Sequence, residues 1–288
     1  MVGGTGVRGF AQAGVLTALE RAGLPPDVVV GVSTGAVVAA TYAAREDWSR
    51  ALQSVDRGRL PSLAPRPEED VSLARLRTAF RSAKQLAPSV WTWGRQGYEE
   101  YGRATLADLL GDGRRFEDTR VPLAQVATDL SEGRSRVLME GHLATATLAA
   151  STLPGVTRPV EVEGRLLVDG AFTDPAPVDV ARGMGADVVL VIHCLGDTTP
   201  DEPDNWIMAL VRGMEIGQHA FAEERLAQAD LVVRPDLGNS VRALDFTGLD
   251  NAVRRTATAL QERLPELERL LGRPRSESPP PSPERRES

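Results

Sequence analysis

The chain has 288 residues, enough for one large domain with its own core, and its 42% hydrophobic and 25% charged residues indicate a globular protein. A net charge of −7 without a long basic run argues against nucleic acid as a main partner, and the single cysteine, Cys194, excludes a disulfide framework. The sequence contains no apolar run of about 18 residues and no basic-then-apolar leader. We therefore expect a cytoplasmic protein.

The first third of the chain predicts helix, strand and helix, followed by a change of pattern. Apolar residues at helical spacing predict a helix over 10–22, which ends at Gly23. A short apolar strand over 28–32 and a helix over 34–44 follow. Residues 46–118 contain amphipathic segments broken by prolines, together with most of the aromatic residues. We expect this stretch to form a helical cap or lid.

From residue 121 the pattern becomes regular again. The expected elements are strands over 123–130 and 135–139, a helix over 142–151, a hairpin over 159–169 with its turn at Glu163-Gly164, a helix over 177–185, a strand over 187–194, a helix over 204–229, a strand over 231–235 and a helix over 249–271. This alternation favours a three-layer α/β sandwich around a mainly parallel sheet. The last sixteen residues, 273–288, are rich in proline and serine and are expected to be a disordered tail.

One serine lies between two glycines where the strand over 28–32 gives way to the next helix, in the pattern Gly31-x-Ser33-x-Gly35. A Gly-x-Ser-x-Gly sequence in that context is typical of a nucleophile elbow. The turn is tight, so its flanking residues must be small, and it pushes the serine Oγ into the open. The pattern predicts that Ser33 is a nucleophile.

A glycine-rich segment at residues 3–9, Gly-Gly-Thr-Gly-Val-Arg-Gly, leads directly into the first predicted helix. Its small residues let backbone N–H groups converge at a helix N-terminus, where an oxyanion is stabilised. Residues 4–9 also fit Gly-x-Gly-x-x-Gly, but a dinucleotide site needs an acidic residue at the end of the next strand. That strand ends in the serine elbow instead, so we expect an oxyanion hole rather than a nucleotide site.

A serine nucleophile needs a base, and the candidates are three histidines and one aspartate. His193 lies inside an apolar strand and is expected in the core, whereas His219 lies among charged residues of a helix and is expected to be exposed. His142 precedes a helix and is expected as a cap or surface residue. Asp169 ends an apolar strand and Gly170 turns the chain away, as an active-site carboxylate requires. Asp169 is the favoured base, and a Ser-His-Asp hydrolase using His142 is the alternative.

These blocks, taken together and in this order, resemble the patatin-like phospholipases, bacterial members above all, over roughly residues 2–195. The matching blocks are residues 4–9, Gly31-Val32-Ser33-Thr34-Gly35, the stretch "VATDLSEG", the stretch "ATATLAASTLPGVTRPVEVEGRLLVDGA" and Asp169-Gly170-Ala171. The resemblance implies a Ser-Asp dyad without histidine. Ser33 would attack an ester carbonyl and Asp169 would accept its proton.

The resemblance also implies roles for the residues around the dyad. Backbone N–H groups of Gly4, Thr5 and Gly6 would hold the oxyanion, and Arg8 would anchor the glycine-rich loop. The other supporting motif residues are Gly9, Gly31, Gly35, Gly170 and Ala171. No metal and no other cofactor is implied. The acyl hydrolase domain would span 1–272. Because only Met1-Val2 precede the glycine-rich segment, we expect the family's first strand to be missing or truncated.

The implied substrates are phospholipids, lysophospholipids or related lipid esters, with transient contact to a membrane surface. Trp91, Trp93, Tyr98 and Tyr101 either meet a lipid–water interface or pack the cap onto the sheet. The acidic charge balance argues against strong attraction to anionic membranes. An alternative function is that of a relative with weak or absent catalysis that acts as a lipid- or protein-binding module.

Overall fold

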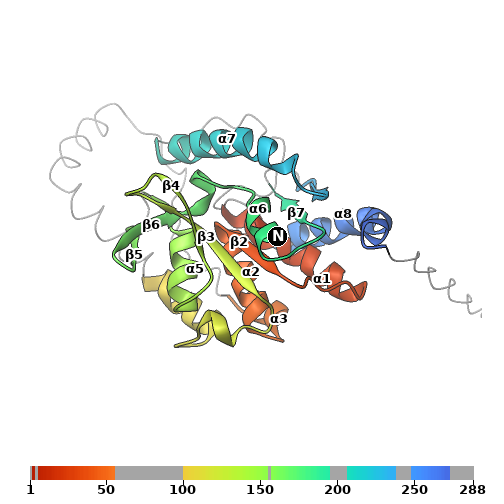
Figure 1. Cartoon of the computed structure of the whole chain (residues 1–288), viewed down its shortest axis with the longest axis horizontal. Helices are drawn as coiled ribbons and strands as arrows, with labels where there is room; N and C mark the ends of the chain where they lie inside the picture. Colours follow the sequence, from red (N-terminus) through yellow and green to blue (C-terminus); the bar gives the residue numbers. More distant parts are fainter. Residues whose placement is uncertain are drawn as a thin grey trace, which may run out of the picture.

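The strands in the described part of the protein form one eight-stranded sheet (Figure 1). The computed structural model describes residues 2–3, 6–55, 100–154, 157–194, 206–237 and 248–272. Its strands are β1 (Val2–Gly3), β2 (Val29–Val32), β3 (Leu123–Asp129), β4 (Arg134–Leu138), β5 (Val160–Val162), β6 (Arg165–Asp169), β7 (Leu190–His193) and β8 (Leu231–Val233). Their order is β5-β6-β3-β2-β1-β7-β8, and β4 pairs with β3 outside that path.

The sheet is mixed, with a parallel part and an antiparallel part that meet at β3. Strands β3, β2, β1, β7 and β8 run parallel, whereas β4, β5 and β6 join through antiparallel pairs. The parallel half agrees with the sequence prediction. Short turns join β3 to β4 and β5 to β6, as antiparallel pairing allows, whereas β6 returns to pair with β3 only after β4, α5 and β5.

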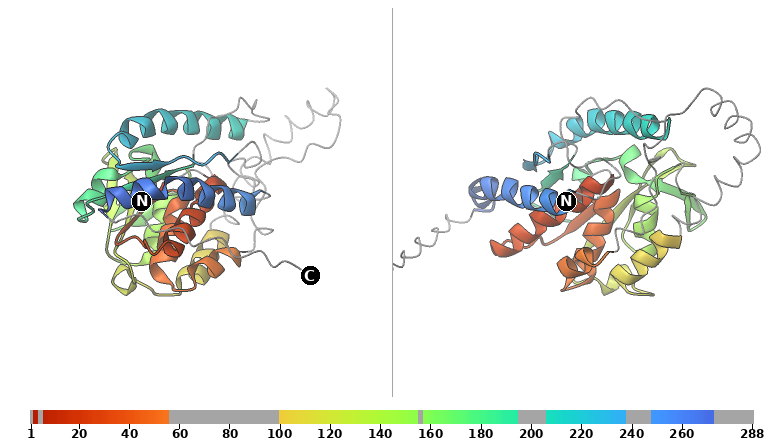
Figure 2. Two further views of the ribbon diagram at one scale, coloured as in Figure 1. Left: turned by 90° about the vertical axis from the view of Figure 1, so that its right-hand side faces the viewer. Right: turned by 180° about the vertical axis from the view of Figure 1, so that it is seen from behind.

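Helices cover both faces of the sheet. One face carries α1 (Ala13–Arg21), α2 (Thr34–Ala44), α3 (Trp48–Gln53), α5 (Leu143–Ser151) and α8 (Leu249–Leu270), and the other carries α6 (Val178–Gly183) and α7 (Trp206–Leu226). Alternate strand residues divide between the two cores: Val29 packs into the first, Val30 and Val32 into the second. Figure 2 shows α7 on one side of the molecule, with α1 and α8 apart from it. The three-layer α/β fold is confirmed.

Most predicted elements agree with the structure to within a few residues. The hairpin turn lies at Glu163 and Gly164, both with positive φ, as the sequence indicated. The first helix differs, because residues Gly6–Gln12 form a 3₁₀ helix before α1 begins. Glycines at positions 6 and 9 provide weak helix propensity there, and 3₁₀ turns are frequent at helix N-termini.

Strand β1 is two residues long and lies at the centre of the parallel half. Val2 pairs with Gly31 of β2 and Ile192 of β7, and Gly3 pairs with His193. The first strand is therefore present, and the described residues of the chain include two of its positions. These pairs place the end of β1 beside the carboxyl ends of β2 and β7, where ligands bind in open parallel sheets.

Several expectations fall wholly or partly outside the described residues. The cap predicted over 46–118 includes 56–99, which are not described, and with them Trp91, Trp93 and Tyr98. The tail at 273–288 is also outside. Within the described part of the chain, no helix combines the length and apolar character needed to cross a bilayer.

Candidate active site

Ser33 occupies the turn between β2 and α2 with an uncommon backbone conformation. Its φ is 56° and its ψ is −140°, a region that side-chain-bearing residues rarely adopt. Gly31 permits the turn, because a Cβ there would lie 2.6 Å from Ala36 Cα. Backbone strain at a serine between a strand and a helix is the expected geometry of a nucleophile elbow.

Asp169, the last residue of β6, faces that turn. Ser33 Oγ donates a hydrogen bond of 2.7 Å to Asp169 Oδ2, although the two residues are 136 positions apart. The backbone N–H of Ala171 donates to the second carboxylate oxygen, Oδ1, at 2.9 Å. Thr128 Oγ1 donates to the Asp169 carbonyl at 2.8 Å. The structure thus brings together the predicted nucleophile and base, and both carboxylate oxygens accept hydrogen bonds.

The dyad is enclosed by protein. Ser33 is 2% exposed and Asp169 is 3% exposed, so the hydroxyl expected in the open is buried in this conformation. The turn is covered because the Ser33 N–H donates to Ala150 O at the end of α5, and the Asp169 N–H donates to Thr152 O just beyond it. Burial raises the pKa of Asp169 to about 6, while the hydrogen bonds from Ser33 and Ala171 oppose that rise.

Two motif glycines hold the surrounding segments close together. A Cβ at Gly170 would lie 2.1 Å from Val126 O, so the chain after Asp169 can cross β3 only with glycine there. A Cβ at Gly9 would lie 1.9 Å from Oγ1 of Thr34, the residue after Ser33. The glycine-rich segment therefore packs directly against the elbow.

Part of the predicted oxyanion hole lies beyond what the structure describes. Gly4 and Thr5 are outside the described residues, and Gly6 is the first residue of the 3₁₀ helix. Arg8 lies within that helix, and its side chain is not among those described. The oxyanion role of this segment and the anchoring role of Arg8 remain predictions.

His142 is far from the dyad. It caps the N-terminus of α5, where its Nδ1 accepts from the Thr145 N–H at 3.4 Å. Ser33 contacts Ala150 near the other end of that helix, eight residues along and therefore about 12 Å away. His142 is the helix cap that the sequence allowed, and Asp169 is the residue that accepts a hydrogen bond from Ser33 Oγ.

The other two histidines lie together on the α7 side of the sheet. His193 is buried as predicted, and burial, with Arg234 and His219 nearby, lowers its pKa to about 4. The prediction that His219 is exposed was wrong, because it is half-buried and stacks on His193 with ring centroids 5.5 Å apart. The sequence could not reveal this contact, which depends on how α7 crosses the end of β7.

Gln125 is a supporting residue that sequence reasoning missed. It lies in the middle of β3 at 0% exposure, paired in register with Gly31. Its Nε2 donates to Ala36 O in the first turn of α2 at 3.1 Å and to Thr147 Oγ1 of α5 at 3.2 Å. The side chain therefore ties together the two helices that enclose Ser33. Its signal in the sequence was a single polar residue in the apolar run "LAQVA".

Comparison with related sequences shows the family of the chain. The profile of the patatin-like phospholipase family matches residues 1–182. The chain belongs to this family. An uncharacterised NTE family protein of Mycobacterium tuberculosis (strain H37Rv) is 32% identical over 218 residues, which are 73% of this chain and 54% of that protein.

Other members of the family share the same region. The lysophospholipase nte1 of Aspergillus niger is 32% identical over 204 residues, 69% of this chain and 12% of that protein. The human patatin-like phospholipase domain-containing protein 6 is 31% identical over 194 residues, 67% of this chain and 13% of that protein. The chain thus spans about half the length of the mycobacterial relative and a small part of the others.

A solved structure shows the same fold. The crystal structure of VipD from Legionella pneumophila superposes with a TM-score of 0.52 at 13% sequence identity, covering 91% of this chain and 66% of that one. At that identity the likeness concerns the fold alone.

Proposed function

We propose that the protein hydrolyses carboxylic esters of phospholipids, lysophospholipids or related lipids, with Ser33 as nucleophile and Asp169 as general base. The observation that carries the proposal is the buried 2.7 Å hydrogen bond from Ser33 Oγ to Asp169 Oδ2 at a strained strand–helix turn. Membership of the patatin-like phospholipase family and the name of the Aspergillus relative support the choice of lipid esters.

The first step forms an acyl-enzyme. Ser33 Oγ attacks the ester carbonyl while its proton passes along the existing hydrogen bond to Asp169 Oδ2. A pKa of about 6 makes Asp169 a stronger base than an ordinary carboxylate, yet leaves it mostly ionised at neutral pH. The Ala171 N–H holds the other oxygen, so the carboxylate keeps its orientation.

Breakdown of the tetrahedral intermediate uses the same proton. Protonated Asp169 returns it to the leaving alcohol, and the acyl chain stays on Ser33. A water molecule then gives its proton to Asp169 and attacks the acyl-serine, which releases the fatty acid and restores the hydroxyl. We assign stabilisation of both oxyanions to backbone N–H groups of Gly4, Thr5 and Gly6.

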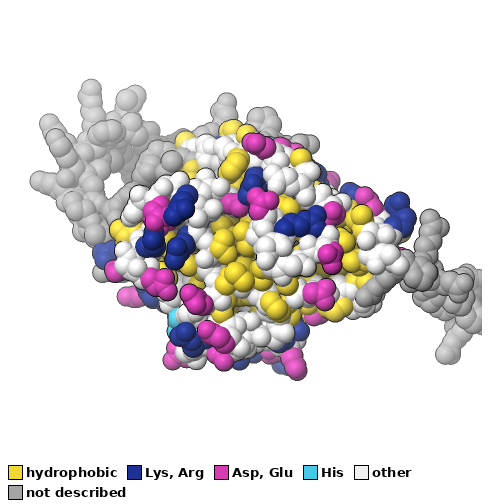
Figure 3. Space-filling model, in the orientation of Figure 1, with side chains coloured by type: hydrophobic (Ala, Val, Ile, Leu, Met, Phe, Trp, Pro, Cys, Tyr) yellow, Lys and Arg dark blue, Asp and Glu magenta, His cyan; other side chains and the backbone are white. Residues whose placement is uncertain are grey.

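The protein would bind its substrate at a lipid surface. With a net charge of −7, the protein has no overall attraction to anionic membranes, so contact is transient. Figure 3 shows basic and acidic side chains mixed over one face, without a large patch of either sign.

A fluorophosphonate probe tests the proposal. We expect labelling of the wild-type protein at Ser33, no labelling of Ser33→Ala, and labelling slowed by about 10²–10⁴-fold in Asp169→Asn. His142→Ala is the matched control and should label like wild type. The labelling rate should also fall as the pH drops below about 6, because protonated Asp169 cannot accept the serine proton.

The rates at which wild type and these variants hydrolyse lysophosphatidylcholine and short acyl esters should rank in the same order as their labelling rates. Folded wild-type protein that neither labels nor hydrolyses either substrate would overturn the proposal in favour of a lipid- or protein-binding relative. Loss of labelling in His142→Ala would instead favour the Ser-His-Asp alternative. Circular dichroism of each variant checks that it is folded.

A further inference from the structure

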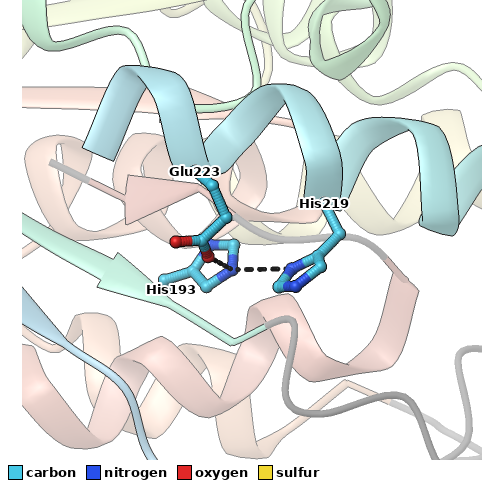
Figure 4. Close-up of side chains that lie close together, drawn as sticks. All are labelled: His193, His219 and Glu223. Atoms are coloured by element: carbon cyan, nitrogen blue, oxygen red, sulfur yellow. Dashed lines mark hydrogen bonds and ion pairs between the residues drawn. The ribbon is translucent and has the colours of Figure 1, made fainter. Parts of the chain in front are cut away.

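Two histidines and a glutamate converge on the α7 side of the sheet, away from the dyad. His193 is the last residue of β7, and His219 and Glu223 lie four positions apart on α7. Their candidate ligand atoms all lie within 4.8 Å of one another. Figure 4 shows both α7 side chains directed toward His193. We refer to these three residues as the His–Glu cluster.

The distances within the cluster suit a shared ion better than direct hydrogen bonds. His193 Nε2 lies 3.4 Å from His219 Nδ1 and 3.9 Å from Glu223 Oε1. The first distance is at the upper limit of a hydrogen bond, and the second is beyond it. Nitrogen ligands about 2.0–2.1 Å from a tetrahedral zinc are separated by about 3.4 Å, and a carboxylate oxygen lies at a similar distance. The two histidines already match that spacing, and the carboxylate of Glu223, whose oxygen lies within 4.8 Å of both nitrogens, would have to turn inward to complete it.

We propose that the His–Glu cluster binds a divalent transition-metal ion, for which its two imidazoles and one carboxylate favour zinc. Residues four apart on a helix face the same way, so α7 supplies two ligands without distortion. Three protein ligands leave one coordination position for water, as in other His₂Glu zinc sites.

Arg234 acts on this site in two opposite ways. Its guanidinium donates to both oxygens of Glu223, at 2.6 and 2.8 Å. These bonds orient the carboxylate, as outer partners of metal ligands commonly do, and each oxygen keeps a lone pair for the ion. The positive charge of Arg234 lowers the affinity for a cation. Glu223 is 45% exposed, so solvent screens part of that repulsion.

The position of the cluster indicates a structural role for the ion. Gly3 of β1 pairs with His193, so the ion would tie α7 to the sheet beside the strand that leads into the glycine-rich segment. The dyad lies on β6 and after β2, and β1 separates β2 from β7. An ion in the cluster therefore has no part in the proton transfer between Ser33 and Asp169.

Isothermal titration of Zn²⁺ into chelator-treated protein, purified without a polyhistidine tag, tests the site. We expect one ion per chain with a micromolar or lower Kd. His219→Ala and Glu223→Gln should weaken binding by about 10–100-fold or more. Glu224→Gln removes the neighbouring exposed carboxylate of α7, and His142→Ala removes an exposed histidine; both should bind like wild type.

Two further readouts identify the ligands. Co²⁺ should give visible absorption bands of a four-coordinate site in wild type, and these should be absent from His219→Ala. Zn²⁺ should raise the melting temperature of wild type and of both controls, but not that of His219→Ala. Absence of stoichiometric binding by wild type, or equal binding by folded His219→Ala, would overturn the proposal. His219 is half-buried, so this variant is a safer test than one at buried His193.

Discussion

Ser33 and Asp169 each oppose folding in the geometry that suits them for their proposed roles in catalysis. Ser33 holds a φ of 56°, which a residue with a Cβ adopts at a cost of roughly 1–3 kcal/mol. Asp169 holds a carboxyl group at 3% exposure, where the charged form is disfavoured. A substitution that removes the backbone strain at Ser33 or the buried charge at Asp169 should make the protein more stable and less active.

For Asp169 the expected stability change depends on pH. Its pKa is about 6 in the folded chain and near 4 in the unfolded chain, so the folded state binds more protons between these values. The stability from this group is complete below about pH 4 and is lost as the pH rises through 6, by roughly 3 kcal/mol. Because asparagine does not ionise, Asp169→Asn should not lose this stability as the pH rises.

Urea unfolding at a series of pH values measures this effect. Asp169→Asn should be more stable than wild type at pH 8, and the difference should shrink steadily toward pH 4. A difference that stays constant between pH 8 and pH 4 would show that ionisation of Asp169 is not its source.

For Ser33 a pair of variants separates backbone strain from the loss of the hydroxyl. Ser33→Ala and Ser33→Gly both remove the hydrogen bond to Asp169, but only glycine adopts the φ of 56° freely. We expect Ser33→Gly to be more stable than Ser33→Ala by about 1 kcal/mol, measured by urea unfolding. Equal stability of the two variants would mean that the turn stores no strain.

The β5–β6 hairpin is the element whose detail the sequence predicted best. Its turn residues, Glu163 and Gly164, have φ values of 52° and 76°, as a two-residue type I′ turn requires. Glycine suits this turn and glutamate does not, because a side chain disfavours the left-handed region. A residue that adopts positive φ more readily than glutamate at position 163 should therefore stabilise the turn. Strand β6, which follows the turn, ends at Asp169.

Glu163→Asn should stabilise the protein by about 0.5–1 kcal/mol, since asparagine tolerates positive φ. The change also removes an ion pair with Arg136 at 3.6 Å, which is exposed and contributes little. Glu163→Gln is the matched control, because it removes the charge without favouring the turn. The free energy of unfolding, measured by chemical denaturation, should be higher for Glu163→Asn than for wild type, and equal to or slightly below wild type for Glu163→Gln. A Glu163→Asn variant no more stable than Glu163→Gln would contradict the turn argument.

Elements with strong local signals were predicted from the sequence, whereas contacts between distant elements were not. The elbow, the Asp169 turn and the hairpin each depend on a few neighbouring residues, and their motifs specify them. The link of Gln125 to Ala36 and Thr147 joins three elements through one side chain. The stacking of His219 on His193 depends on the docking of α7, which no local pattern specifies.

At the scale of the whole molecule, the fold could be inferred because the order of apolar strands and helices limits the possible arrangements. The antiparallel pairing of β6 with β3 was harder to predict, because β4, α5 and β5 separate these two strands along the chain. A part-buried ion pair between Arg225 and Asp174, at 3.0 Å, helps to hold α7 over its face of the sheet, and a charged pair of this kind has no periodic signature.

The central place of β1 has a consequence for synthesis of the chain on the ribosome. One edge of β1 pairs with β2, and its other edge pairs with Ile192 and His193 of β7. The first helix also waits for a late partner: α1 packs so closely on α8 that a Cβ at Gly14 would lie 2.0 Å from Val253 O. At a translation rate of about 5–20 residues per second, roughly 10–40 s pass between the emergence of β1 and that of β7. During that time a strand edge of the future sheet centre is unpaired, so the nascent chain depends on protection from aggregation until β7 has been made.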